Sequence, residues 1–116
     1  MQYLCLIYEA ESLMAQKSEQ ENQEIFSEYM KFTDDIKTSG HFVAGEPLMP
    51  TETATTIRIR NGETTTTDGP FAETKEQLGG YYLVEAASLD DAIEVASRIP
   101  AARFGCIEVR PIMVFG

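Results

Sequence analysis

The sequence predicts a single α+β domain in which two helices cover one face of an antiparallel β-sheet and a β-hairpin is inserted in the middle. Its 116 residues, 43% hydrophobic and 24% charged, suit one globular domain spanning residues 1–116. Two amphipathic helical patterns each lie between strand patterns, which favours helices packed on a sheet. An Asn-Gly pair between two alternating segments indicates the hairpin.

The first predicted strand is Gln2–Tyr8, and both of its faces are apolar. Alternate residues of a strand point to opposite faces, so Tyr3, Cys5 and Ile7 oppose Leu4, Leu6 and Tyr8. A strand with two apolar faces is typical of the centre of a sheet that is covered on both sides. The residues Glu9–Ala15 are expected to form a connection.

The first helix is predicted to begin after Ser18 and to end near Gly40. Ser18 and Glu21 have the spacing of a capping box, in which each side chain binds the other residue's backbone N–H. A glycine such as Gly40 commonly follows the last helical turn. The apolar stripe of this helix comprises Ile25, Tyr29, Phe32 and Ile36, widened by Phe26 and Met30.

The middle of the chain predicts a second strand and then the hairpin. The second strand spans His41–Glu46, and an alternating segment follows at Thr53–Arg60. The pair Asn61-Gly62 predicts a two-residue type I′ turn. That turn fixes the pairs Arg60 with Glu63, Ile59 with Thr64, and Thr55 with Asp68.

The remaining segments predict a turn, a strand, a helix and a last strand. Asp68-Gly69-Pro70-Phe71 is a turn by its residue types, and the polar segment Ala72–Leu78 has room for a short helical turn. Gly79–Glu85 is a strand with two apolar faces, and Gly79-Gly80 indicates a bulge or a close backbone approach. Ser88 caps a helix that Pro100 ends, and its stripe is Leu89, Ala92, Ile93, Ala96 and Ile99. Cys106–Ile112 is the last strand, with Ile107 and Val109 opposite Glu108 and Arg110.

This order of elements is βαββαβ with an inserted hairpin, which is the ferredoxin-like arrangement. Right-handed crossovers place both helices on the same face of the sheet. The other face is apolar but has no helix to cover it, and soluble monomers rarely expose a large apolar patch. The sequence therefore predicts a homodimer in which two sheets pack face to face, with pockets near the ends of the paired sheets.

The chain is acidic, with 19 Asp and Glu against 9 Lys and Arg and a net charge of −10. This charge argues against binding to nucleic acid or to anionic lipid. No apolar run is long enough to cross a membrane, and the apolar start lacks the basic lead of a signal peptide. Cys5 and Cys106 lie in apolar segments, where they are expected to be buried thiols, and a cytoplasmic location is the default expectation.

One long motif resembles a known family. Thr67–Glu85 reads Thr-Asp-Gly-Pro-Phe-Ala-Glu-Thr-Lys-Glu-Gln-Leu-Gly-Gly-Tyr-Tyr-Leu-Val-Glu, which is similar to the signature of DGPF-domain proteins in the YCII-related superfamily. The segments Tyr3–Tyr8, Ala44–Leu48 and Arg98–Arg103 resemble the same family, so the similarity covers nearly the whole chain.

The resemblance implies a dimeric α/β barrel of ferredoxin-like subunits. It also implies a bacterial, cytoplasmic protein of a kind often encoded beside sigma factors of the extracytoplasmic-function type. The wider superfamily includes members proposed as enzymes with a His and an Asp in a cleft, one of them a dehydrochlorinase of a chlorinated hydroxyquinol. This sequence departs from that pattern, because its first helix holds no histidine and its single histidine, His41, follows the helix.

Three residues are candidates for acid–base chemistry. Asp68 is either a residue that binds its own turn or a general base at the mouth of a pocket. Glu46, at the end of the second strand, is either a solvated carboxylate or a partner of Asp68 or Glu73 around a ligand. His41 is either an exposed residue that the helix dipole favours or a base.

Phe71, Glu73 and Tyr81 are the candidate ligand-binding residues. The spacing of positions 41, 46, 68 and 73 matches no metal-ligand pattern, and the chain has neither a P-loop nor a Gly-x-Gly-x-x-Gly motif, so we expect no metal and no cofactor. The first functional hypothesis is a small-molecule-binding or acid–base enzymatic barrel for an apolar or aromatic ligand. The alternative is a non-catalytic regulatory protein in a sigma-factor circuit. A deep apolar cleft would favour the first hypothesis and a filled interior the second.

Overall fold

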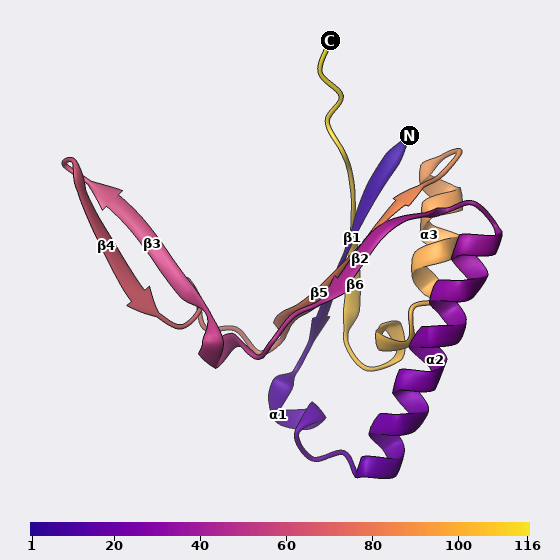
Figure 1. Cartoon of the computed structure of the whole chain (residues 1–116), viewed down its shortest axis with the longest axis horizontal. Coiled ribbons are helices and arrows are strands. Elements are labelled where there is room, and N and C mark those ends of the chain that lie inside the picture. Colours follow the sequence, from indigo (N-terminus) through magenta and orange to yellow (C-terminus); the bar gives the residue numbers. More distant parts are fainter.

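The computed structural model describes residues 1–116 and contains a four-stranded antiparallel sheet in the order β2-β5-β1-β6 (Figure 1). The strands are β1 (Gln2–Glu9), β2 (Phe42–Pro47), β5 (Gln77–Glu85) and β6 (Cys106–Pro111). The two strands with two apolar faces, β1 and β5, occupy the centre of this sheet, as the sequence predicts.

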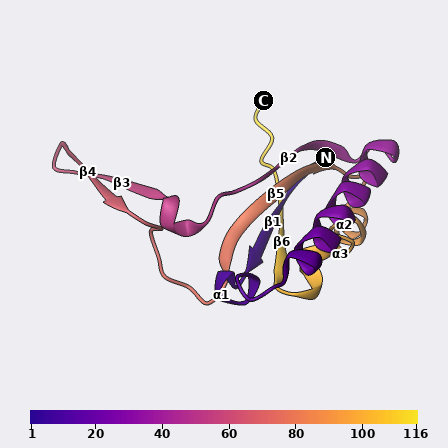
Figure 2. The same ribbon diagram turned by 60° about the horizontal axis from the view of Figure 1, so that its bottom comes forward.

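Both long helices, α2 (Glu19–Thr38) and α3 (Leu89–Ser97), lie on the same face of the sheet (Figure 2). The fold is therefore ferredoxin-like. The segment expected as a connection after β1 contains the short helix α1 (Glu11–Met14), and 3₁₀ turns occur at Thr51–Thr53 and Pro100–Arg103. The segment before β5 forms no helical turn, and β5 begins at Gln77, earlier than expected. No helix of the chain combines the length and the apolar character that a membrane crossing requires.

The capping box that begins α2 is confirmed. The Ser18 hydroxyl accepts a hydrogen bond of 3.1 Å from the Glu21 N–H, and the Glu21 carboxylate accepts one of 3.1 Å from the Ser18 N–H. Two of the backbone donors at the start of α2 are thus satisfied by local side chains. Ser88 caps α3 in the same way by accepting from the Asp91 N–H.

The core lies between the sheet and the two helices. Phe32 and Ile36 of α2 pack there against the sheet, and α3 buries Ala92, Val95 and Ala96, while Leu89 and Ile93 of its expected stripe remain about half exposed. The sheet contributes Tyr3, Cys5, Ile7, Tyr82 and Val84. Burial raises the pKa of the Cys5 thiol to about 11, so this cysteine is an inert core residue.

Cys5 is buried but Cys106 is exposed, so the expectation that both thiols are buried is wrong. Cys106 begins the edge strand β6 and is exposed, because it points to the sheet face that no helix covers. Its thiol lies 3.7 Å from a Glu76 carboxylate oxygen. Burial, and then the Glu76 carboxylate, raise the pKa of the thiol and keep it protonated.

Strands β3 (Thr55–Arg60) and β4 (Glu63–Asp68) form a separate two-stranded ribbon, hereafter the hairpin arm. The predicted register is confirmed at all three pairs, and Asn61 and Gly62 have the positive φ angles, 52° and 78°, of a type I′ turn. The arm projects from the sheet on the side opposite the helices (Figure 1). Because of the arm, the radius of gyration is 16.2 Å, whereas about 13 Å is typical of a compact chain of this length.

His41 joins the two helices at one end of the molecule. Its Nδ1 lies 2.7 Å from the Ser39 hydroxyl at the end of α2, and its Nε2 lies 3.1 Å from the Asp91 carboxylate in the first turn of α3. Only 18% of the His41 side chain is exposed, which is less than expected for a solvated helix-end histidine. The backbone N–H of Ala87 donates to the same Asp91 carboxylate.

We predict that Asp91 makes the stability of the domain sensitive to acid. The Ala87 N–H, and then His41, lower the pKa of Asp91 below its ordinary value, so its contribution is present above about pH 4 and is lost as the pH falls through the lowered pKa. Asp91→Asn should therefore be less stable than the wild type at pH 7, and the difference should shrink below pH 4. Urea unfolding at several pH values measures this, and Asp90→Asn is the matched control. Equal pH slopes for all three proteins would contradict the prediction.

Gly45 of β2 is predicted to be intolerant of any side chain. A Cβ at this position would lie 2.6 Å from the Tyr82 ring, which packs edge-on against Phe32 with a centroid distance of 5.1 Å. Gly45→Ala should therefore cost about 1–3 kcal/mol of unfolding free energy through overpacking. Gly79→Ala is the control, because a Cβ there meets nothing within 4 Å. Chemical denaturation would refute this explanation if the two variants were equally stable.

Candidate functional site

A pocket of about 450 Å³ lies between α2 and the edge of the sheet formed by β2 and β5. Its volume is within the range of small-molecule sites. Five of the 15 lining residues are aromatic, and they come from both the helix and the strands. The lining residues are Ile7, Glu9, Phe26, Tyr29, Met30, Thr33, Lys37, Phe42, Gly45, Glu46, Pro47, Gly79, Gly80, Tyr81 and Tyr82.

Glycines open the strand side of this pocket. The pairing of β1 with β5 shifts between Ile7 and Tyr8, whose partners are Gly80 and Leu78, so Gly79 is the extra residue of a bulge. The backbone of Gly80 approaches β2 so closely that a Cβ would lie 3.0 Å from the Glu46 carbonyl oxygen. The Gly79-Gly80 pair thus serves both purposes that the sequence indicates, a bulge and a close approach.

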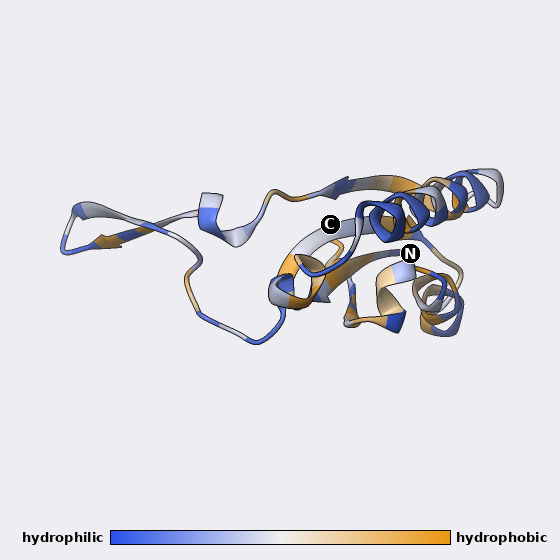
Figure 3. Cartoon of the chain, turned by 90° about the horizontal axis from the view of Figure 1, so that it is seen from below, coloured by the Kyte–Doolittle hydropathy of each residue, from blue (hydrophilic) through white to orange (hydrophobic).

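The helix side of the pocket is formed by residues that α2 does not bury. Phe26 and Met30, expected in the buried stripe, are 66% and 53% exposed and line the pocket instead. In Figure 3, α2 is seen lying over the sheet with its hydrophilic residues outward. The stripe is buried only at Phe32 and Ile36, nearer the end of the helix, which leaves the first half of α2 free to form a wall.

Several polar side chains line this largely apolar space. The hydroxyls of Thr33 and Tyr82 lie 2.8 Å apart and satisfy each other. Glu9 ends β1, and burial raises the pKa of its carboxyl, against a smaller opposing effect of Lys17. Burial, and then the Glu9 carboxylate, raise the pKa of the neighbouring Tyr29 phenol. Glu9 is therefore the pocket carboxyl with the environment of a general acid or base.

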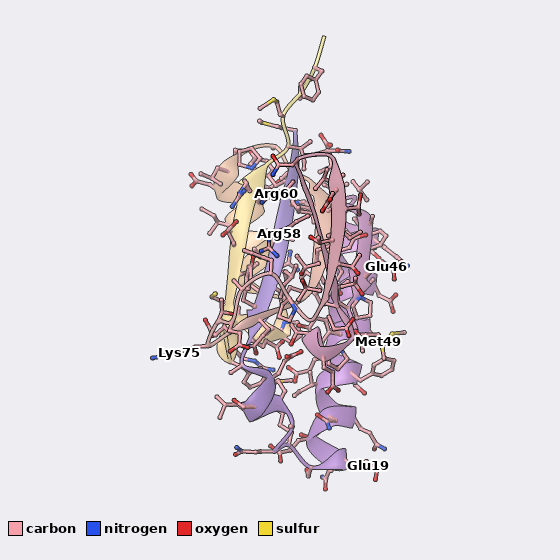
Figure 4. The ribbon with its side chains drawn as sticks, turned by 90° about the vertical axis from the view of Figure 1, so that its left-hand side faces the viewer. Glu19, Glu46, Met49, Arg58, Arg60 and Lys75 are labelled. Carbon is pink, nitrogen blue, oxygen red and sulfur yellow. The ribbon has the colours of Figure 1, made fainter.

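Two of the residues predicted as site residues border this pocket. Glu46 and Tyr81 are directly paired across β2 and β5, but Tyr81 is also paired with Leu6, so both side chains point to the face of the sheet that no helix covers. Figure 4 shows Glu46 on the α2 side of the molecule and Lys75 on the opposite side.

The other predicted site residues lie elsewhere in this chain. Asp68 is exposed at the end of β4 nearest the sheet, opposite Thr55, and does not line the pocket. Phe71 is 79% exposed, and Glu73 is also exposed; neither lines the pocket. His41 lies between Ser39 and Asp91, also outside it.

The bonded set Ser39, His41 and Asp91 has the residue types of a nucleophilic triad but lacks donors for an oxyanion. The backbone N–H groups of Ser39, Gly40 and His41 all donate to carbonyls of α2. These three N–H groups are therefore not free to stabilise the charge of a tetrahedral intermediate. The set therefore acts as a link between the two helices.

The chain has no cluster of three or more His, Cys, Asp or Glu side chains close enough to hold a metal ion. A second pocket, of about 550 Å³, is wider, more polar and lies between α1 and the 3₁₀ turn at Thr51–Thr53. Its main carboxylate, Glu11, already accepts hydrogen bonds of 2.9 and 2.6 Å from the N–H and hydroxyl of Thr51. That carboxylate fixes the loop, so the aromatic pocket is the better candidate site.

The sequence alone did not identify Glu9, Thr33 or Lys37 as site residues. Glu9 was placed in a connection just beyond β1, and Thr33 and Lys37 belong to no motif. The available signal was the position of Thr33 and Lys37 one and two turns after Tyr29 and Met30, on the same side of the helix as the wall of the pocket.

Comparison with known proteins agrees with this fold. An uncharacterised protein, R00369, of Rhizobium meliloti (strain 1021) is 38% identical over 117 residues, covering 99% of this chain and 94% of the relative. The solved structure of 5-chloro-2-hydroxyhydroquinone dehydrochlorinase (TftG) from Burkholderia phenoliruptrix AC1100, in complex with 2,5-dihydroxybenzoquinone, is similar with a TM-score of 0.56. It is 15% identical, covering 97% of this chain and 94% of that chain, so the likeness concerns the fold. The family model of the YCII-related domain matches residues 1–116, and the chain therefore belongs to the YCII-related family.

Proposed function

We propose that this protein binds a small aromatic molecule in the pocket between α2 and the β2–β5 edge, and that it carries out acid–base chemistry there. The aromatic lining of a 450 Å³ pocket is the observation that carries the proposal. Glu9 is the residue we assign to proton transfer, because it lines the pocket and burial raises the pKa of its carboxyl. The structural neighbour was solved in complex with 2,5-dihydroxybenzoquinone, which supports an aromatic or quinonoid ligand class.

The pocket favours this function over that of a non-catalytic sigma-factor partner, because an interaction protein needs no open apolar interior. A bacterial cytoplasmic setting remains the expectation that the family resemblance implies. A role for Asp68, Phe71 and Glu73 would require a second copy of the chain, whose hairpin arm would bring them to a pocket in trans.

We also propose that the protein works as a homodimer with its sheets face to face. The uncovered face carries half-buried Leu4 and Leu6 of β1 beside Leu83 and Tyr81 of β5. Ile57 and Ile59, which are 63% and 62% exposed, belong to the hairpin arm, and the arm extends from the side of the sheet opposite the helices (Figure 1). Two-stranded hairpins are marginal in water by themselves, so a second copy that covers both the face and the arm would stabilise both.

A substitution of Phe26 tests whether the pocket binds an aromatic ligand. Phe26→Ala should weaken the binding of a hydroxylated aromatic probe such as 2,5-dihydroxybenzoquinone about tenfold, because it removes an aromatic wall worth roughly 1–2 kcal/mol. The fold should be unchanged, since this side chain is 66% exposed. Isothermal titration calorimetry measures the affinity and circular dichroism the fold.

Two control variants lie outside the pocket, Phe71→Ala and Asp68→Asn. Each should bind the probe as the wild type does if the pocket acts within one chain. Loss of binding in these two variants but not in Phe26→Ala would move the site to the hairpin arm and overturn the assignment.

A substitution of Leu4 tests the proposed homodimer. The wild type should elute at twice its chain mass of 12.9 kDa at micromolar concentration. Leu4→Lys places a charge in the centre of the uncovered apolar face and should give a folded monomer. Leu89→Lys, at a 50% exposed position of α3, should remain dimeric. A wild type that scatters as a 12.9 kDa monomer would refute the proposal.

A further inference from the structure

We infer that the pocket selects aromatic ligands that carry a negative charge and that Lys37 binds that charge. This inference rests on the proposed function, because it names the class of molecule that the same pocket accepts. It is drawn from the placement of one cation and two carboxylates around an aromatic space.

Lys37 is the only cationic side chain that lines the pocket. It lies in the last turn of α2, and its Nζ is 5.0 Å from the centroid of the Phe42 ring, which is also part of the lining. Cation–π contact of this kind holds an ammonium over an apolar surface. The contact with Phe42 thus holds the Lys37 charge at the aromatic lining, where an anionic group on a bound ring can pair with it.

The charge of Lys37 is not neutralised within the chain. The six ion pairs of the protein involve the N-terminal amine, Lys31, His41, Arg98, Arg103 and Arg110, and Lys37 is in none of them. The chain has 19 acidic residues for 9 basic ones, so carboxylates are plentiful, yet none lies within ion-pair distance of Lys37. Lys31, one and a half turns earlier, pairs with Asp35 at 2.9 Å.

The charged groups Glu9 and Lys37 therefore lie at different points along the pocket. The Glu9 carboxylate raises the pKa of the Tyr29 phenol. Tyr29 comes eight residues before Lys37, which corresponds to roughly 12 Å along an α-helix. The long Lys37 side chain leans toward the start of the helix and shortens that separation. A flat ring with an anionic group at one end and a hydroxyl at the other matches this order, since the hydroxyl can donate to the Glu9 carboxylate.

Two probes of nearly the same shape test the inference, 4-hydroxybenzoate and its neutral amide, 4-hydroxybenzamide. The wild type should bind the carboxylate at least tenfold more tightly at pH 7.5, and the preference should decline as salt is added. Lys37→Met should weaken 4-hydroxybenzoate about tenfold while leaving 4-hydroxybenzamide within about twofold. Lys37→Arg should retain most of the preference, because it keeps the charge.

Lys31→Met is the matched control, since Lys31 lies on the same helix, is 78% exposed and does not line the pocket. It should leave both affinities unchanged. If Lys37 served only to stabilise the end of α2, Lys37→Met would lower the unfolding free energy and affect both probes equally, which would overturn the inference. Equal binding of the two probes by the wild type would also overturn it, while leaving the pocket function intact. Binding of neither probe, nor of 2,5-dihydroxybenzoquinone, would refute both the pocket function and the inference.

Discussion

The structure depends on one imbalance: the sheet has two apolar faces, but the chain has helices for only one of them. On the face covered by α2 and α3, a hydrophobic core that includes Tyr3 and Val95 fills the space between the sheet and the helices. The opposite face carries half-buried leucines and a tyrosine, and the hairpin arm extends from that side of the sheet. Burial of apolar surface is the dominant favourable term in folding and association, so this face accounts both for the proposed dimer and for the direction in which the arm leaves the domain.

The pocket has a different origin, because it lies on the face that is covered. There α2 packs tightly only near its end, at Phe32 and Ile36, and its first half stands away from the strands. The absent side chain at Gly79, in the bulge, leaves space in the facing strands, and the absent side chain at Gly45 makes room for the Tyr82 ring. What would otherwise be core becomes a cavity with an aromatic lining. This arrangement leaves Glu9 partly buried and raises the pKa of its carboxyl, the type of perturbation that marks functional sites.

Much of the fold could be predicted from the sequence, because the local signals are strong and agree with one another. The capping box of Ser18 and Glu21 and the turn at Asn61-Gly62 fix their neighbours through short-range geometry, and both are confirmed. The site could be predicted only in part. Glu46 and Tyr81, selected from their positions in the strands, border the pocket and stay predictions as site residues, whereas Glu9 and Lys37 line it only because two distant elements leave a space between them. The same dependence on tertiary position explains why Cys106, in an apolar segment, is exposed at a sheet edge.

The hairpin arm also has a consequence for local stability. All six residues of β4 are exposed, and four of them are consecutive threonines, so no side chain of this strand anchors the arm in the core. In a single chain, fluctuations can then open the ribbon without disturbing the four-stranded sheet, so we expect its amide protons to exchange faster than those of the sheet. Residues inserted at its tip, Asn61-Gly62, should therefore cost the domain the least stability.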